Sequence, residues 1–171
     1  YDYQPSRGGY HAEEFLKGFS GYLTCDGFSG YNKLKKVIRC GCLAHMRRYW
    51  HDALPGKMKT ASERPPAEVG FDYCNQLFKL EEKYAGLDAD TRKAKRLETE
   101  PAIWEAYWSW LETVNPTGGS RLEKAVTYAR NQKPYMENYL LDGRCSISNN
   151  IAENIARPYA VGRKNFLFHD T

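Results

Sequence analysis

The stretch GYLTCDGFSGYNKLKKVIRCGCLAHMRRYWHDAL, residues 21–54, decides the fold class. Residues 21–27 alternate in polarity and end at Asp-Gly, which is typical of a strand that runs into a turn. We expect a short helix over 29–36, a largely apolar second strand over 37–45 and a helix over 46–54. A strand–helix–strand–helix succession of this kind predicts an α/β fold.

The segments on either side of this stretch have different residue patterns. YDYQPSR at 1–7 predicts the end of a strand that enters a loop, and 9–19 predicts a short helix with Phe15 and Leu16 facing inward. The run PGKMKTASERPP at 55–66 is rich in proline, lysine and serine and predicts a loop. After this loop the sequence pattern changes from alternating strands and helices to helices alone.

Helical patterns dominate the next part of the chain, over about eighty residues. We expect a helix over 67–86, and Pro101 divides 91–114 into two helices or one kinked helix. An apolar stripe at helical spacing predicts a buried helix face and consists of Trp104, Tyr107, Trp108 and Leu111.

Two further helices are expected before the chain returns to the core. Residues 118–132 contain Ser120 followed three positions later by Glu123, the signature of a capping box. Residues 133–143 predict a separate helix with Pro134 near its first turn. The predicted organisation is therefore an α/β core interrupted by an all-helical insertion, with core segments at 1–54 and 144–171 and the insertion at 55–143.

The final segment contains an unusual helix, in which a single carboxylate stands among small apolar residues and asparagines. Ser148 is a candidate N-cap, Ile151 and Ile155 are expected to face a core, and Pro158 should kink or end the helix. One helix face gathers Asn150, Glu153, Asn154 and Arg157. One carboxylate, two amides and a guanidinium on one face resemble the wall of an active site.

Charge is distributed unevenly along the chain, although the net charge is only +4. Residues 31–64 hold nine Lys/Arg against two Asp/Glu, whereas residues 67–112 hold six Lys/Arg against ten Asp/Glu. A basic segment beside an acidic one suits a polyanion such as DNA, and an ordinary solvated surface stays open as the alternative. The sequence has five cysteines without a disulfide-type spacing, which suits a reducing cytoplasm, and no apolar run long enough to span a membrane.

Asp26 is the best candidate for a second carboxylate that binds a metal together with Glu153. Carboxylates from different elements can hold a divalent metal that activates water for phosphodiester chemistry, and Asp26 ends a predicted strand beside Gly27, which allows a close approach. Ligand sites of open α/β sheets lie at the carboxyl ends of strands. The simpler alternatives are an Asp-Gly turn for Asp26 and an ion pair with Arg157 for Glu153.

Five stretches carry a resemblance that covers nearly the whole chain. They are YDYQPSR, GYLTCDGFSGYNKL, GCLAHMRRYW, AVTYARNQ and SNNIAENIARPYAVGRKNFLF. The chain resembles the C-terminal part of an insertion-sequence-66 family transposase, a bacterial DDE transposase with an RNase H-like catalytic core. The last stretch, with its paired Asn149 and Asn150, is the most distinctive.

The resemblance implies a catalytic role for two carboxylates. Asp26 corresponds to the second and Glu153 to the third carboxylate of the DDE set, which together bind Mg²⁺ (or Mn²⁺). The first aspartate is expected on an upstream strand, so the isolated chain should be inactive. DNA contacts are expected from Arg47, Arg48, Arg157, Arg163 and Lys164. The implied partners are transposon ends, target DNA, further copies of the protein and accessory transposition proteins, in a bacterial cytoplasm at the nucleoid.

A cysteine–histidine pair follows the second aspartate in this family and corresponds to Cys42 and His45. A zinc site that includes Cys40 is disfavoured because the second ligand pair of a structural site is missing. A packing or substrate-positioning role is expected instead. Two other functions stay open for the chain: a catalytically inactive remnant that binds DNA or another protein, and an RNase H-like nuclease that cuts without joining.

Overall fold

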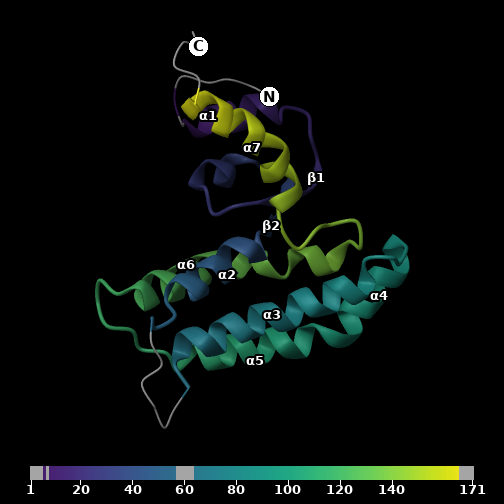
Figure 1. Ribbon diagram of the computed structural model, residues 1–171. Coiled ribbons are helices and arrows are strands. Elements are labelled where there is room, and N and C mark those ends of the chain that lie inside the picture. Colours follow the sequence, from purple (N-terminus) through teal and green to yellow (C-terminus); the bar gives the residue numbers. More distant parts are fainter. Residues whose placement is uncertain (1–5, 7, 57–63, 166–171) are drawn as a thin grey trace.

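The structure is a computed structural model that describes residues 6, 8–56 and 64–165, without the side chains of residues 159, 160 and 163–165. The strand expected over 1–7 therefore lies outside the described residues, apart from Ser6. Figure 1 shows two parts, which we call the sheet lobe and the helical lobe. The sheet lobe contains α1 (Gly9–Phe15), β1 (Gly21–Cys25), the 3₁₀ helix η1 (Ser29–Lys33), β2 (Val37–Gly41) and α7 (Asn150–Asn165). The helical lobe contains α2 (Leu43–Asp52), α3 (Pro66–Tyr84), α4 (Ala89–Thr99), α5 (Pro101–Glu112), α6 (Arg121–Met136) and the 3₁₀ helix η2 (Asn138–Leu141).

The sheet has two parallel strands in the described residues, and η1 lies in the crossover between them. The register runs from Gly21 opposite Val37 to Cys25 opposite Gly41. The strand expected over 37–45 is wrong at its end, because β2 stops at Gly41 and α2 begins at Leu43. The backbone N–H of Leu43 donates to the carbonyl of Ile147, outside the sheet, at 3.0 Å.

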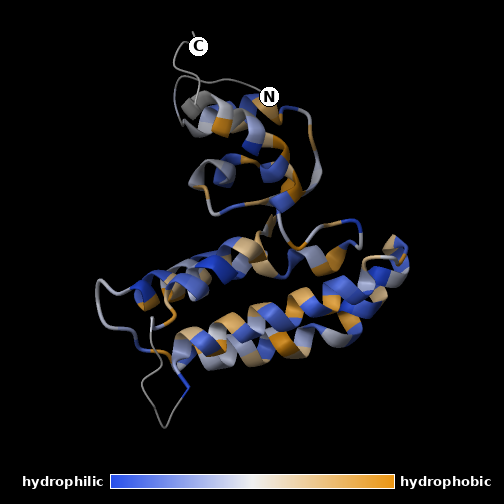
Figure 2. Ribbon diagram, viewed as in Figure 1, coloured by the Kyte–Doolittle hydropathy of each residue, from blue (hydrophilic) through white to orange (hydrophobic). Residues whose placement is uncertain are grey.

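The helical lobe is built around aromatic residues, as the stripe on α5 predicts. Trp104, Tyr107 and Leu111 are fully buried, and the indole N–H of Trp50 on α2 donates to the hydroxyl of Tyr107 at 3.1 Å. Buried apolar residues of these helices form one cluster, and hydrophobic positions recur along the helices in Figure 2. Gly70 of α3 lets the Trp50 ring approach, since a Cβ there would lie 2.4 Å from the ring. The core cluster also includes β2 and α2, and the domain boundaries at 54 and 143 stay a prediction.

Helix ends follow the sequence signals at two places and depart from them at a third. Pro101 begins α5, and the Ser120 hydroxyl accepts the backbone N–H of Glu123 at 3.0 Å. Pro134 does not begin a new helix but lies inside α6, which continues to Met136. Pro134 has no backbone N–H to donate within α6, and Met136 and Tyr139 just beyond it are buried.

Two expectations about inward-facing residues of the sheet lobe are wrong. Ile151 and Ile155 on α7 are 71% and 63% exposed, and Phe15 on α1 is 68% exposed. The half-buried side of α7 instead carries Glu153 and Ala156, so the helix turns its carboxylate toward the protein. The helix also runs past Pro158 to Asn165, and the proline does not end it. Within the described ranges, no helix is both long and apolar enough to cross a membrane.

Candidate active site

Asp26 lies at the carboxyl end of β1. One of its oxygens, Oδ1, accepts the backbone N–H of Phe28 at 3.1 Å, so the residue does form the Asp-Gly turn expected as its simpler role. The side chain also lines a cavity of about 430 Å³ together with His11 and Tyr31. Because only one oxygen makes a hydrogen bond within the described residues, the carboxylate can hold the turn and face a ligand.

Glu153 is paired with a histidine of α2. Its Oε1 lies 3.4 Å from Nε2 of His45, and its side chain is 38% exposed. Both Glu153 and Arg157 are described, and no ion pair forms between them, so the i,i+4 alternative is not what the structure shows. Within the described residues, Nδ1 of His45 is buried without a hydrogen-bond partner. His45 thus contacts Glu153, and its packing or substrate-positioning role stays a prediction.

Cys42 connects the segments that carry the two carboxylates. Its backbone N–H donates to the carbonyl of Cys25, the residue before Asp26, at 3.1 Å. Its sulfur accepts the backbone N–H of Asn149 at 3.5 Å, and the carbonyl of Asn149 accepts the first helical hydrogen bond of α7 from Glu153 at 3.0 Å. Asn149 rather than Ser148 is therefore the N-cap residue of α7. Burial raises the pKa of the Cys42 thiol, which suits a neutral packing role.

Gly27 allows a close approach, as expected, but the approaching group is part of the protein. A Cβ at this position would lie 3.0 Å from the ring of Tyr128 and 3.1 Å from the amide of Gln132, both on α6. Burial, with smaller contributions from Cys42 and Asp26, raises the pKa of Tyr128. The Tyr128 hydroxyl is buried and has no hydrogen-bond partner within the described part of the chain. Sequence reasoning did not identify this residue, which contacts the loop of Asp26.

The basic residues predicted to contact DNA fall into three groups. Arg48 and Arg157 are exposed. Arg47 is half-buried, because its Nε donates to Oδ1 of Asn75 on α3 at 2.6 Å. The side chains of Arg163 and Lys164 lie outside the described residues.

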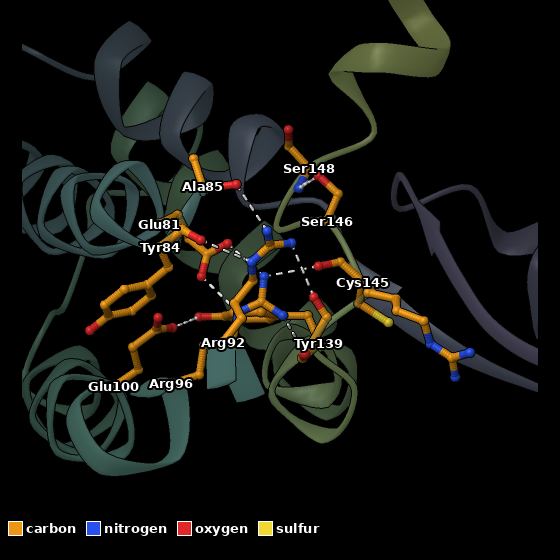
Figure 3. A network of polar contacts seen from close by, with 12 residues as sticks. Glu81, Tyr84, Ala85, Arg92, Arg96, Glu100, Tyr139, Cys145, Ser146 and Ser148 are labelled. Carbon is orange, nitrogen blue, oxygen red and sulfur yellow. Dashed lines mark hydrogen bonds and ion pairs between the residues drawn. The ribbon is translucent and has the colours of Figure 1, made fainter. Parts of the chain in front are cut away.

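A buried arginine of the helical lobe, also absent from the sequence prediction, holds the segment that leads to α7. Arg96 is 1% exposed and forms a bidentate pair with Glu81 at 2.6 and 2.7 Å (Figure 3). Its other guanidinium N–H groups donate to three backbone carbonyls at 2.9 to 3.2 Å, those of Tyr139, Asp142 and Cys145. We call the segment 139–145 the hinge segment. Arg96 satisfies carbonyls of this segment that would otherwise be buried without a donor.

Other contacts hold the hinge segment and the residue that follows it. Arg92 donates to the carbonyl of Gly143 at 3.2 Å as well as to carbonyls at the end of α3 and just after it (Figure 3). Tyr139 donates its hydroxyl to Glu100, whose pKa burial raises to about 7. From the sheet lobe, the hydroxyl of Thr24 donates to the carbonyl of Ser146 at 3.1 Å. The sequence offers no signal for these contacts, because α4 reads as an ordinary charged helix.

Asp26 and Glu153 each carry the kind of group that a hard cation binds. Mg²⁺ prefers oxygen ligands, which Asp26 and Glu153 provide, and Oδ1 of Asn149 is buried without a partner in the described residues. Among the described residues, however, no three His, Cys, Asp or Glu side chains gather into one metal-binding group. A metal site shared by Asp26 and Glu153 therefore stays a prediction.

Comparison with known proteins identifies the family to which the chain belongs. The family model for the Transposase IS66 family matches residues 1–171. The uncharacterized protein y4qI of Sinorhizobium fredii is 32% identical over 181 residues, which cover 98% of this chain and 32% of that protein. The uncharacterized protein y4hP of the same organism is 28% identical over 179 residues, which cover 95% of this chain and 32% of that protein. The chain thus spans about a third of the length of these relatives, and no solved structure matches it. The chain belongs to the IS66 family of transposases.

Proposed function

We propose that this chain contributes two of the three catalytic carboxylates of a DDE transposase, which cuts DNA at transposon ends and joins the exposed 3′-hydroxyl to target DNA. The sheet lobe is then part of an RNase H-like core, and the helical lobe is an insertion into it. The observation that supports the proposal most is the shared anchor at Cys42. The segments that carry Asp26 and Glu153, far apart in sequence, are both hydrogen-bonded to this residue.

Asp26 and Glu153 would hold Mg²⁺ (or Mn²⁺) together with an aspartate from an upstream strand. When bound, the ion supplies positive charge that polarises the phosphate and activates the attacking oxygen. His45 orients the Glu153 carboxylate through its contact at 3.4 Å. Cys42 fixes the start of α7, because its sulfur accepts the Asn149 N–H.

The basic side chains would bind the DNA backbone. Arg48 and Arg157 are exposed, and we propose that Arg163 and Lys164 further along α7 also contact phosphates. Such contacts position the DNA without reading its sequence. Transposition as proposed takes place on the bacterial nucleoid and uses more than one copy of the protein at the paired ends.

The proposal is tested in the full-length protein with Glu153→Gln. We expect strand cleavage and joining to be abolished while DNA binding is almost unchanged, because the amide keeps the shape of the side chain but loses its charge. Replacement of both Arg163 and Lys164 by alanine should do the reverse. Binding should weaken, and the salt dependence should become shallower by about 0.9 per lost phosphate contact on B-DNA.

The same cleavage, joining and binding assays distinguish a transposase from a nuclease and from an inactive remnant. Wild-type protein that cuts DNA but never joins it would be an RNase H-like nuclease. Wild-type protein that binds DNA without cutting it would be an inactive remnant. If Glu153→Gln leaves the enzyme fully active, Glu153 is a structural partner of His45 and the proposal is wrong.

A further inference from the structure

A polar cavity lies where the helical lobe meets the first residue of α7. Its volume is about 640 Å³, and its lining includes Ala44 of α2 and Asn150 of α7. This volume falls within the range of about 300–1,000 Å³ that is typical of small-ligand sites. Ala44 precedes His45, and Asn150 lies one helical turn before Glu153. The cavity is therefore next to the candidate active site but separate from it.

One face of α3 forms most of the lining. Spacings of three and four residues place polar side chains in a single stripe along the helix, and these are Asp72, Asn75, Gln76, Lys79 and Glu82. Phe78 adds an aromatic ring. Amide side chains both donate and accept hydrogen bonds, so Gln76 and Asn150 can pair with a ligand that has both kinds of group at its edge.

Arg47 is held in place before any ligand arrives. Its Nε donates to Asn75 at 2.6 Å, and the centre of its guanidinium lies 4.5 Å from the ring centroid of Phe71 and 6.0 Å from that of Phe78. A guanidinium fixed in this way offers a flat surface and its remaining N–H groups to the cavity. Planar guanidinium and phenyl groups are the surfaces on which unpaired nucleobases stack in other proteins.

The charges of the lining indicate what kind of ligand fits. Arg47 and Lys79 are balanced by Asp72 and Glu82. Arg64, which pairs with Asp72, is also paired with Glu68, so the surroundings of the cavity have no excess of positive charge. A phosphate group would meet two carboxylates as well as two cations, and binding it here gains little. A neutral planar group with donors and acceptors along its edge suits this lining better.

We propose that this cavity receives the base of an unpaired nucleotide from the DNA strand at the candidate active site. The base stacks on Phe78 and the Arg47 guanidinium, while Gln76 and Asn150 bind its edge. This inference rests on the proposed function and deepens it, because it assigns the helical lobe a role in holding the DNA end. Extruding a base costs unstacking energy, which is smallest at a strand end that is already single-stranded.

The test measures binding of the 171-residue chain to a fluorescently labelled DNA hairpin with a short single-stranded overhang. The same hairpin with abasic residues in the overhang keeps every phosphate and removes the bases. We expect the abasic hairpin to bind at least about fivefold more weakly, the lower end of the effect of losing one stacked base. Phe78→Leu and Gln76→Ala should each reduce this difference, and Asn131→Ala should not, because Asn131 is an exposed amide on α6 that does not line the cavity.

The outcomes of this binding test distinguish failure of the inference from failure of the proposed function. Equal binding of the two hairpins would overturn the inference and leave the proposed function standing, because the phosphates alone would account for binding. Absence of DNA binding even at low salt, in both this chain and the full-length protein, would overturn the proposed function as well. If Phe78→Leu and Gln76→Ala change self-association in ultracentrifugation but not the dependence on bases, the cavity holds a protein segment and the inference is wrong.

Discussion

The helical lobe buries its large apolar side chains, whereas the sheet lobe leaves many of them exposed. In the helical lobe, Trp50, Trp104 and Tyr107 are fully buried and make hydrogen bonds or ring contacts with one another or with their neighbours. Most of the exposed large apolar side chains belong to the sheet lobe and its connections: Tyr10, Phe15, Phe19, Ile38, Ile151, Ile155 and Val161. The chain thus buries its aromatic residues in one lobe and leaves apolar residues at the surface of the other.

The well-buried core and the candidate catalytic residues therefore lie in different lobes. A sheet of two strands is marginally stable by itself, so the sheet lobe needs support from elsewhere. Such support comes from α6, which packs on Gly27, and from the amide of Asn138, which donates to the carbonyl of Arg39 on β2 at 2.7 Å. The candidate catalytic residues therefore lie in the less well-buried lobe and depend on the helical lobe for their positions.

The largest expected effect compares one buried and one exposed apolar residue. Trp104→Ala should lower the free energy of unfolding by about 3–5 kcal/mol, because it leaves a cavity in the core. Ile151→Ala should change it by no more than about 0.5 kcal/mol, since the side chain is exposed. Urea denaturation followed by circular dichroism measures both. Similar losses for the two variants would contradict the division between lobes.

A second comparison concerns the arginine that holds the hinge segment. Arg96→Met should lower the free energy of unfolding by about 3 kcal/mol or more, because it leaves Glu81 and three carbonyls without their donor. Amide hydrogen exchange should increase over residues 142–149 more than in α5. Lys95→Met is the matched control, since Lys95 forms only a solvent-exposed pair with Glu98, and its loss should change stability little. Unchanged exchange over 142–149 in Arg96→Met would refute the role of Arg96.

The smallest effect is a pH dependence that originates at Glu100. Burial raises its pKa from 4.5 to about 7, while the hydrogen bond from Tyr139 and the charge of Arg96 oppose the shift and Glu81 adds to it. The folded state therefore keeps a proton that the unfolded state loses. The stabilisation is complete below about pH 4.5 and is lost as the pH rises through about 7, with an upper limit of roughly 3 kcal/mol.

Glu100→Gln should remove this pH dependence, because the amide does not titrate. The measurement is the free energy of unfolding at several pH values between 4 and 8, with exposed Glu98→Gln as the control. The same slope in wild type and Glu100→Gln would show that other groups cause it.

Local signals predicted much of the fold. The strand that ends before Asp26, the N-cap at Ser120 and the break at Pro101 depend on neighbouring residues, and the structure confirms each. The capping box itself is only half formed, because the Glu123 carboxylate accepts the backbone N–H of Gly119 and not that of Ser120. The failures involve tertiary contacts. Ile151 is exposed because α7 turns Glu153 toward His45, and periodicity alone cannot choose between two faces of a helix.

The candidate site was predicted only in part. The sequence pointed to Glu153 and His45, and the structure brings them into contact. Arg96 and Tyr128 were missed because their partners are distant in sequence: Arg96 binds carbonyls 43 to 49 residues away, and Tyr128 contacts the Asp26 loop from α6. No local pattern encodes such contacts, since an arginine on a charged helix usually faces solvent.

The central claim is that Asp26 and Glu153 share one metal site. The most direct test is a crystal structure of the full-length protein with Mn²⁺ and a DNA end, in which anomalous scattering locates the metal. The account predicts Mn²⁺ in contact with both side chains, whose carboxylate oxygens lie within roughly 4–8 Å of each other, as ions about 3.5–4 Å apart require. Mn²⁺ bound elsewhere, with Asp26 and Glu153 on opposite faces of the domain, would contradict it.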